Sequence, residues 1–284
     1  MLAAGGATRP ARAGGLFGGT APGELAAAFE RASGLAGNLD AAEAEWGVAL
    51  GLAEGVRDES LRRRGTAAAL SNRGAIRLQA GNWAGAEDDL RAATVLDRQE
   101  GSLNGATLNN LGNAEGAMGN WDGALEHWKE ASGLEKDMQP IALANLALGY
   151  FQVGRTGEAV AEARSLVRKD PAYWDMHAAL ASFLWASGDE RGAEAAWNDL
   201  CVVGGDDRDA APQSAASGAP SGTAASGIQR PVQTGAACEL YAQGTGIVSG
   251  RWPPRAIAAL DAFLKVSRRG DGVGYDGNPL SFDF

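Results

Sequence analysis

The chain has 284 residues, a net charge of −10 and a pI near 4.8. Such an acidic balance argues against nucleic-acid binding, because phosphate contact depends on Lys and Arg. Glycine (41 residues) and alanine are abundant and aromatic residues make up 7%, which suits a repeat array with tails better than an enzyme with a deep core. No apolar run reaches the ~18 residues that a transmembrane span needs.

Residues 1–22 contain Arg9 and Arg12 but no Asp or Glu. This pattern is typical of an organelle transit segment, so we expect either a flexible N-terminal arm or the remnant of a transit peptide. The Gly-rich stretch GGLFGGTAPG lacks the Gly-Lys-Ser/Thr ending of a phosphate-binding loop and therefore predicts no nucleotide site.

Residues 104–137 read as a helix, a tight turn at Gly119-Asn120 and a second helix, and this hairpin recurs along the chain. The turn glycines are 38, 35 and 34 residues apart. Each is followed five residues later by Ala. Four residues after that Ala comes a large residue, except in the third copy, where it is Ala. These positions are Gly81, Ala86 and Leu90; Gly119, Ala124 and Trp128; Gly154, Ala159 and Ala163; Gly188, Ala193 and Trp197. Each glycine is expected to end a helix with φ > 0, and each alanine to let the paired helices approach.

The same spacing is found upstream at Gly37, Ala42, Trp46 and Ala49, in a hairpin with a poor first helix. We therefore expect a degenerate, capping hairpin at 23–56. The segment ESLRRRG at 59–65 is expected to join it to the first full repeat, with its arginines solvated.

The pattern resembles the tetratricopeptide repeat (TPR), a 34-residue helical hairpin whose copies bury one another's apolar faces. The resemblance implies an all-α fold, an α-α superhelix or TPR solenoid, with an array over 57–203. Its repeats would span about 67–100, 105–138, 140–173 and 174–203. An alternative is a less regular Ala-rich helical array.

Beyond the array, the composition of residues 204–237 shifts to Gly, Ser, Ala and Pro, which predicts a disordered linker. Residues 238–268 then carry Arg251-Trp252-Pro253-Pro254 and an amphipathic helix, expected to dock as a cap on the end of the array with Trp252 beneath it. Residues 269–284 look like a tail. Cys201 and Cys238 flank the linker; free thiols are favoured, and a single bridge stays open.

Segments of the third and fourth copies, together with Arg251-Trp-Pro-Pro, resemble a group of TPR proteins from cyanobacteria and chloroplasts. That resemblance implies a chloroplast setting, with thylakoid association, and a link to photosynthetic assembly or organelle upkeep. It implies no specific biochemical role.

The sequence offers no catalytic constellation, metal-ligand spacing or cofactor motif, so we expect neither an enzyme nor a cofactor. His127 and His177 are the two histidines, and each is expected to be structural.

A partner-binding surface is the better expectation. In TPR hairpins the first helices line a concave groove, and the predicted partner-binding residues here are Asn109, Asn113, Leu148, Phe151, Ser182 and Trp185. Asn109 and Asn113 share a helix face and could bracket an extended peptide, with the aromatic residues as anchors. The equivalent amides Asn72, Asn110 and Asn145 are expected to form inter-repeat hydrogen bonds instead. The groove lacks the Lys and Arg of the clamp that binds EEVD-type chaperone tails, so no such ligand is expected.

The sequence therefore predicts a non-catalytic protein-interaction scaffold that binds a protein or peptide in the concave groove. A self-associating structural module is the alternative, since a helix beyond a long linker could exchange between chains.

Overall fold

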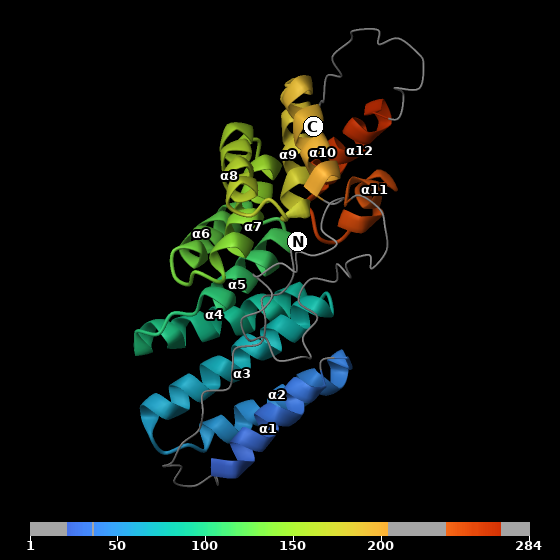
Figure 1. Ribbon diagram of the computed structural model, residues 1–284. Coiled ribbons are helices and arrows are strands. Elements are labelled where there is room, and N and C mark those ends of the chain that lie inside the picture. The colour runs from blue at the N-terminus through green and yellow to red at the C-terminus, as the bar shows by residue number, and fades with distance from the viewer. Residues whose placement is uncertain (1–21, 36, 204–236, 268–284) are drawn as a thin grey trace. The chain divides into compact units, whose positions relative to one another are not determined.

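The computed structural model describes residues 22–35, 37–203 and 237–267, and all regular elements within these ranges are helical. The expected arm (1–22), linker (204–237) and tail (269–284) lie almost wholly outside the described residues. The elements, labelled in Figure 1, are α1 (Pro22–Gly34), α2 (Leu39–Glu54), α3 (Glu59–Gln79), α4 (Trp83–Glu100), α5 (Gly105–Ala117), α6 (Trp121–Ser132), α7 (Gln139–Gln152), α8 (Thr156–Lys169), α9 (Trp174–Ala186), α10 (Glu190–Val203), α11 (Ala237–Ala242), the 3₁₀ helix η2 (Thr245–Val248) and α12 (Pro254–Ser267).

The chain forms two compact units, with the boundary between Asn145 and Leu146 inside α7. Unit 1 contains α1 to α6 and the first part of α7. Unit 2 contains the rest of α7 and the helices that follow it. In unit 1 each helix from α1 to α6 packs against the next one along the chain, as expected for hairpins that bury one another's faces.

The hairpin turns have the geometry that the sequence predicts. Gly81 and Gly119 have φ of 77° and 84°, and Gly154 and Gly188 have 84° and 82°; this left-handed region carries little steric cost only for glycine. Asparagine caps the helix after each of the first two turns, because Asn82 and Asn120 accept a hydrogen bond from a backbone N–H three residues on, at 3.1 and 3.3 Å.

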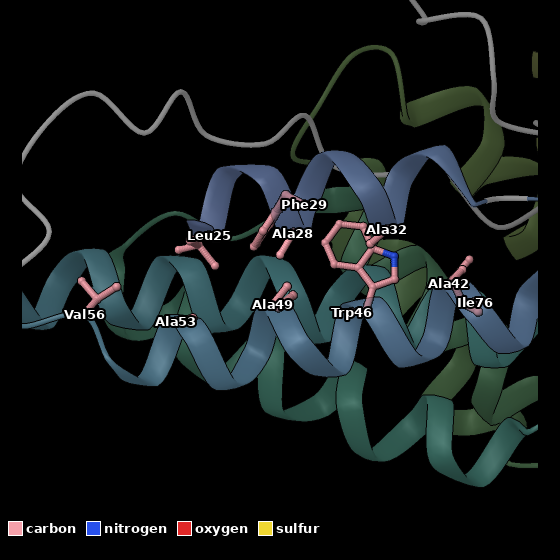
Figure 2. Close-up of a cluster of buried hydrophobic side chains, with 11 residues drawn as sticks. Leu25, Ala28, Phe29, Ala32, Ala42, Trp46, Ala49, Ala53, Val56 and Ile76 are labelled. Atoms are coloured by element: carbon pink, nitrogen blue, oxygen red, sulfur yellow. The ribbon is translucent and has the colours of Figure 1, made fainter. Parts of the chain in front are cut away.

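The upstream hairpin is a genuine part of the core. Phe29 of α1 packs edge-on against Trp46 of α2, with ring centroids 5.0 Å apart. Small and large side chains from α1, α2 and α3 form one buried cluster, shown in Figure 2: Leu25, Ala28, Phe29, Ala32, Ala42, Trp46, Ala49, Ala53, Val56, Ala69 and Ile76. The alanines at 42 and 49 are completely buried, as expected of residues at close helix crossings.

Helix α3 is longer than the predicted first helix of its repeat. It begins at Glu59 rather than near residue 67, with Asp58 as its N-cap. The arginine-rich segment is therefore helical and does not merely join two hairpins. Arg63 forms ion pairs with Glu59 and with the partly buried Glu100, so this arginine is not simply solvated as expected.

The expectation of free thiols is wrong. In unit 2, Cys201 at the end of α10 and Cys238 in α11 form a disulfide, with Cα atoms 4.8 Å apart, well inside the usual range for such bridges. Helix α11 packs on α10, and α12 packs on α9. Trp252, two residues before the start of α12, is buried, with 3% of its surface exposed.

Candidate partner-binding faces

The predicted partner-binding residues fall in both units, and the two sets are treated separately. Asn109 and Asn113 lie one turn apart on α5 in unit 1. Leu148 and Phe151 on α7, with Ser182 and Trp185 on α9, belong to unit 2. We call these the Asn face (Asn109, Asn113) and the aromatic face (Leu148, Phe151, Ser182, Trp185).

The Asn face is part of a buried amide network. Nδ2 of Asn145 donates to Oδ1 of Asn109 at 2.9 Å and to Oδ1 of Asn113 at 3.1 Å. The indole Nε1 of Trp128 donates to the same Asn113 oxygen at 3.1 Å and to the backbone oxygen of Asn109 at 3.2 Å. The expectation that Asn145 forms inter-repeat hydrogen bonds is confirmed. Asn72 donates to the backbone oxygen of Ala68, within its own helix, and the inter-repeat hydrogen bonds expected of Asn72 and Asn110 stay a prediction.

Asn109 retains one hydrogen-bonding group without a partner. Its side chain is fully buried, yet the described residues offer its Nδ2 no acceptor. Buried amide donors are paired in the great majority of cases, and leaving one unpaired costs on the order of 1–3 kcal/mol. Nδ2 of Asn109 is therefore an unpaired donor enclosed within the helix packing. The predicted peptide contact of Asn109 and Asn113 stays a prediction.

The aromatic face is tightly packed. The ring of Phe151 stacks on Phe183 with centroids 4.3 Å apart and planes 19° apart. Phe151 and Leu148 are buried, and the Ser182 hydroxyl donates to the backbone oxygen of Ala178 at 2.7 Å, so this donor is already used within α9. Trp185 is half-buried. The predicted role of these four residues in partner binding stays a prediction.

The chain's own C-terminal segment contacts this face. The guanidinium of Arg255 lies over the ring of Phe151, 5.1 Å from its centroid. The Phe263 ring of α12 meets Trp185 edge-on at 5.9 Å and Trp197 of α10 at 5.2 Å. The sequence predicts that α12 docks on the array, but no local pattern indicates which side chains it contacts.

A buried ionic cluster, missed by sequence analysis, fixes the start of the C-terminal segment. Both nitrogens at the end of the Arg251 side chain reach the Asp175 carboxylate, at 2.7 and 3.2 Å, and the Tyr241 hydroxyl donates to the same group. Asp175 is 3% exposed. Burial, together with the negative charge of Asp175, raises the pKa of Tyr241 far above its usual range. Partners so distant in sequence leave no local pattern that could have revealed them.

A second missed cluster lies in unit 1. The buried Glu115 carboxylate meets Nδ1 of His127 at 2.7 Å and Nη2 of Arg91 at 3.1 Å. His177, in unit 2, has its Nε2 3.0 Å from the backbone oxygen of Pro171, and burial lowers its pKa. Each histidine therefore has a structural partner within the fold.

Two further features concern the described residues: side chains that could hold a metal ion, and helices that could span a membrane. Over residues 22–35, 37–203 and 237–267, no three His, Cys, Asp or Glu side chains are grouped as metal ligands would be. None of the helices in these ranges combines the length and the apolar character required to span a bilayer.

No family model matches the sequence, and no curated protein matches it either. Solved structures are similar in fold. YrrB, described as a TPR protein with an unusual peptide-binding site, is 18% identical over 65% of this chain and 86% of its own, with a TM-score of 0.51. MamA is 15% identical over 63% of this chain and 91% of its own, with a TM-score of 0.52. At these identities the likeness establishes the fold, which is an all-α helical-hairpin array of the TPR type.

Proposed function

We propose that the chain is a non-catalytic protein-interaction scaffold that binds a peptide or protein through the first helices of its hairpins. The hairpin array supports this proposal, because stacked helical repeats form extended concave surfaces of the kind that bind partners. The YrrB structure, of the same fold, is described as having a peptide-binding site. We further propose that the chain acts in a chloroplast, at the thylakoid, in the assembly or maintenance of photosynthetic complexes, as the resemblance of its C-terminal motif implies.

The observation that carries the binding proposal is the unpaired donor of Asn109. A peptide backbone supplies carbonyl oxygens at regular intervals, and an Asn pair one turn apart can bind an extended chain through them. Because Asn109 is fully buried in the free chain, the proposal requires the packing over α5 to open locally. Its Nδ2 then donates to such a carbonyl while its Oδ1 keeps the hydrogen bond from Asn145. Partner binding would satisfy a group that the free chain leaves unpaired.

The test compares the intact chain with an Asn109→Asp variant as baits in a chloroplast extract. The substitution keeps an acceptor oxygen for Asn145 and removes the donor. Glu126→Ala, at an exposed position of α6, is the matched control. The buried carboxylate of Asn109→Asp is expected to lower Tm, so both variants must show wild-type helicity at the temperature of the binding assay. Peptides from a captured protein are then titrated against each chain by fluorescence anisotropy.

We expect the Asn109→Asp chain to lose affinity by about tenfold, corresponding to roughly one hydrogen bond of 1.4 kcal/mol, while Glu126→Ala binds normally. Equal binding by all three chains would place the site elsewhere on the molecule. Capture by none of them would favour self-association, which light scattering over a range of concentrations would reveal.

A further inference from the structure

The C-terminal segment, residues 237–267, covers two of the four side chains of the aromatic face. Phe263 contacts Trp185, and Arg255 lies over Phe151. The segment therefore occupies a surface that the repeat pattern assigns to a ligand.

Helix α12 is held through its N-terminal turn, as a bound ligand helix could be. The backbone N–H of Arg255 donates to Oε1 of Gln152 at 3.0 Å. Arg255 lies in the first turn of α12, directly after Pro254, where backbone N–H groups have no partner within the helix. Gln152 thus recognises the N-terminus of a helix, whatever its side chains are.

Charge adds specificity to this recognition. Asp175 of α9 is buried and receives both Arg251 and the Tyr241 hydroxyl from the segment. A buried carboxylate that loses its partners is strongly destabilising. If the segment leaves, Asp175 is therefore expected to bind another cation. Another aromatic side chain could then replace Phe263 against Trp185 and Trp197.

One polar group of the segment is left without a partner. Trp252 of the segment is buried, but the described residues provide no acceptor for its Nε1. An unsatisfied buried donor of this kind weakens the association. The segment is consequently held in place with help from its covalent link.

That link is the Cys201–Cys238 disulfide, which spans a sequence separation of 37 residues. It fixes the start of α11 beside the end of α10. Without it, the segment is joined to α10 only by the chain between the two cysteines, and its effective concentration at the aromatic face falls. Cys201 is half-buried rather than sealed in the core.

We propose that residues 237–267 are a built-in ligand of the aromatic face, latched by the disulfide, and that a dithiol reductant unlatches it. One thiolate of the reductant attacks a sulfur of the bridge, and its second thiol resolves the mixed disulfide. Cys201 and Cys238 leave as thiols, and the reductant takes up the disulfide. The freed face then binds a partner helix that begins with a basic residue and carries an aromatic one. This inference rests on the proposed scaffold function and names the ligand class for unit 2.

The latch is tested without any partner. Hydrogen exchange of the full chain is followed by mass spectrometry, oxidised and after treatment with dithiothreitol. We expect exchange in 254–267 to rise by about tenfold on reduction, as the effective concentration falls, with α2 as the internal control. A Cys201→Ser, Cys238→Ser double variant should behave like the reduced chain without reductant. Unchanged exchange in both would overturn the latch and make the segment a fixed cap.

The ligand class is tested with a labelled peptide of residues 247–267, titrated by anisotropy. We expect it to bind the reduced chain, or the double Ser variant, about tenfold more tightly than the oxidised chain. The matched control is the same peptide with Arg251→Ala and Phe263→Ala, which should bind at least tenfold more weakly. Asp175→Asn in the double Ser chain should weaken binding of the unmodified peptide.

Equal affinity of the two peptides would overturn the ligand class, even if exchange shows that the latch opens. Both readouts report on unit 2, and neither needs a partner captured from an extract, so they succeed or fail independently of the Asn109 experiment in unit 1.

Discussion

Gly112 of α5 lies directly against the indole of Trp128 in α6. A Cβ built at position 112 would come within 2.7 Å of the Trp128 Nε1 atom. That nitrogen donates to Asn109 and Asn113, so the absence of a side chain at 112 is what lets the indole reach the Asn face. Helix packing and the hydrogen bonding of the candidate site thus depend on the same contact.

Gly112→Ala is therefore expected to destabilise the chain by about 2 kcal/mol, because the added methyl group overpacks the crossing and displaces the indole. Urea unfolding followed by circular dichroism measures this. Gly51→Ala, at a helical glycine of α2 with nothing within 4 Å, is the control and should stabilise by up to about 1 kcal/mol through helix propensity. Equal effects of the two substitutions would contradict the assigned crossing.

The side chain of Asn145 donates two hydrogen bonds, and we expect its removal to lower the free energy of unfolding. Asn145→Ala removes both bonds, to Asn109 and Asn113, and is expected to cost about 2 kcal/mol of unfolding free energy. Asn145→Asp should cost more at pH 7, because a carboxylate would face two carbonyl oxygens, and part of the loss should be recovered at acidic pH. Thermal unfolding at pH 4 and pH 7 distinguishes the variants; an Asp variant as stable as the wild type would refute the network.

Asp89 holds two arginines of α3. Its carboxylate receives Arg73 through two bonds of 2.8 Å and Arg77 at 2.9 Å. Asp89→Asn would leave the partly buried Arg73 without its counter-charge, whereas Arg77 keeps its ion pair with Glu43, and is expected to destabilise by about 3 kcal/mol. The neighbouring, exposed Asp88→Asn is the matched control and should change stability by less than about 0.5 kcal/mol. Chemical denaturation of both chains at pH 7 is the measurement.

Asp97 should make stability fall as the pH rises. Burial raises the pKa of Asp97 from 3.8 to about 6. The folded chain therefore keeps this proton between about pH 4 and pH 6, where the unfolded chain has released it. The stabilisation is complete below pH 4 and is lost as the pH rises through 6.

Asp97→Asn, which mimics the protonated form, should remove this pH dependence and stabilise the chain at pH 7 by about 1 kcal/mol, since partial exposure screens the effect. Unfolding free energies measured from pH 4 to pH 7 provide the test. Asp88→Asn again serves as the control. A profile for Asp97→Asn that parallels the wild type would show that another group is responsible.

The sequence predicted well what is decided locally. A Gly at a turn, Ala five residues later and a large residue four beyond are all within one hairpin, so their spacing alone indicates where Gly119, Ala124 and Trp128 lie. The positive φ of the turn glycines and the buried alanines follow directly. The extension of α3 to Glu59 was missed because its charged residues looked like a connection.

Long-range pairings were beyond sequence reasoning. Asp175 and Arg251 are 76 residues apart, and nothing near either residue indicates the other. The same holds for Cys201 and Cys238, where the distance between the sulfurs depends on how the C-terminal segment docks. The candidate site was therefore predictable as a set of first-helix positions but not as surfaces already contacted by other parts of the chain.

The connections between hairpins in unit 1 have a consequence for engineering. The α4–α5 connection begins at Gly101, with φ 66°, and the α6–α7 connection lies between Ser132 and Gln139. Neither connection is followed by the turn glycine and the buried alanine five residues later that mark a close helix crossing, whereas each turn inside a hairpin is. Added residues should thus be accepted at 101–104 and rejected at 118–120, and a tag or a foreign loop can be grafted at the former site while α5 and α6 stay paired.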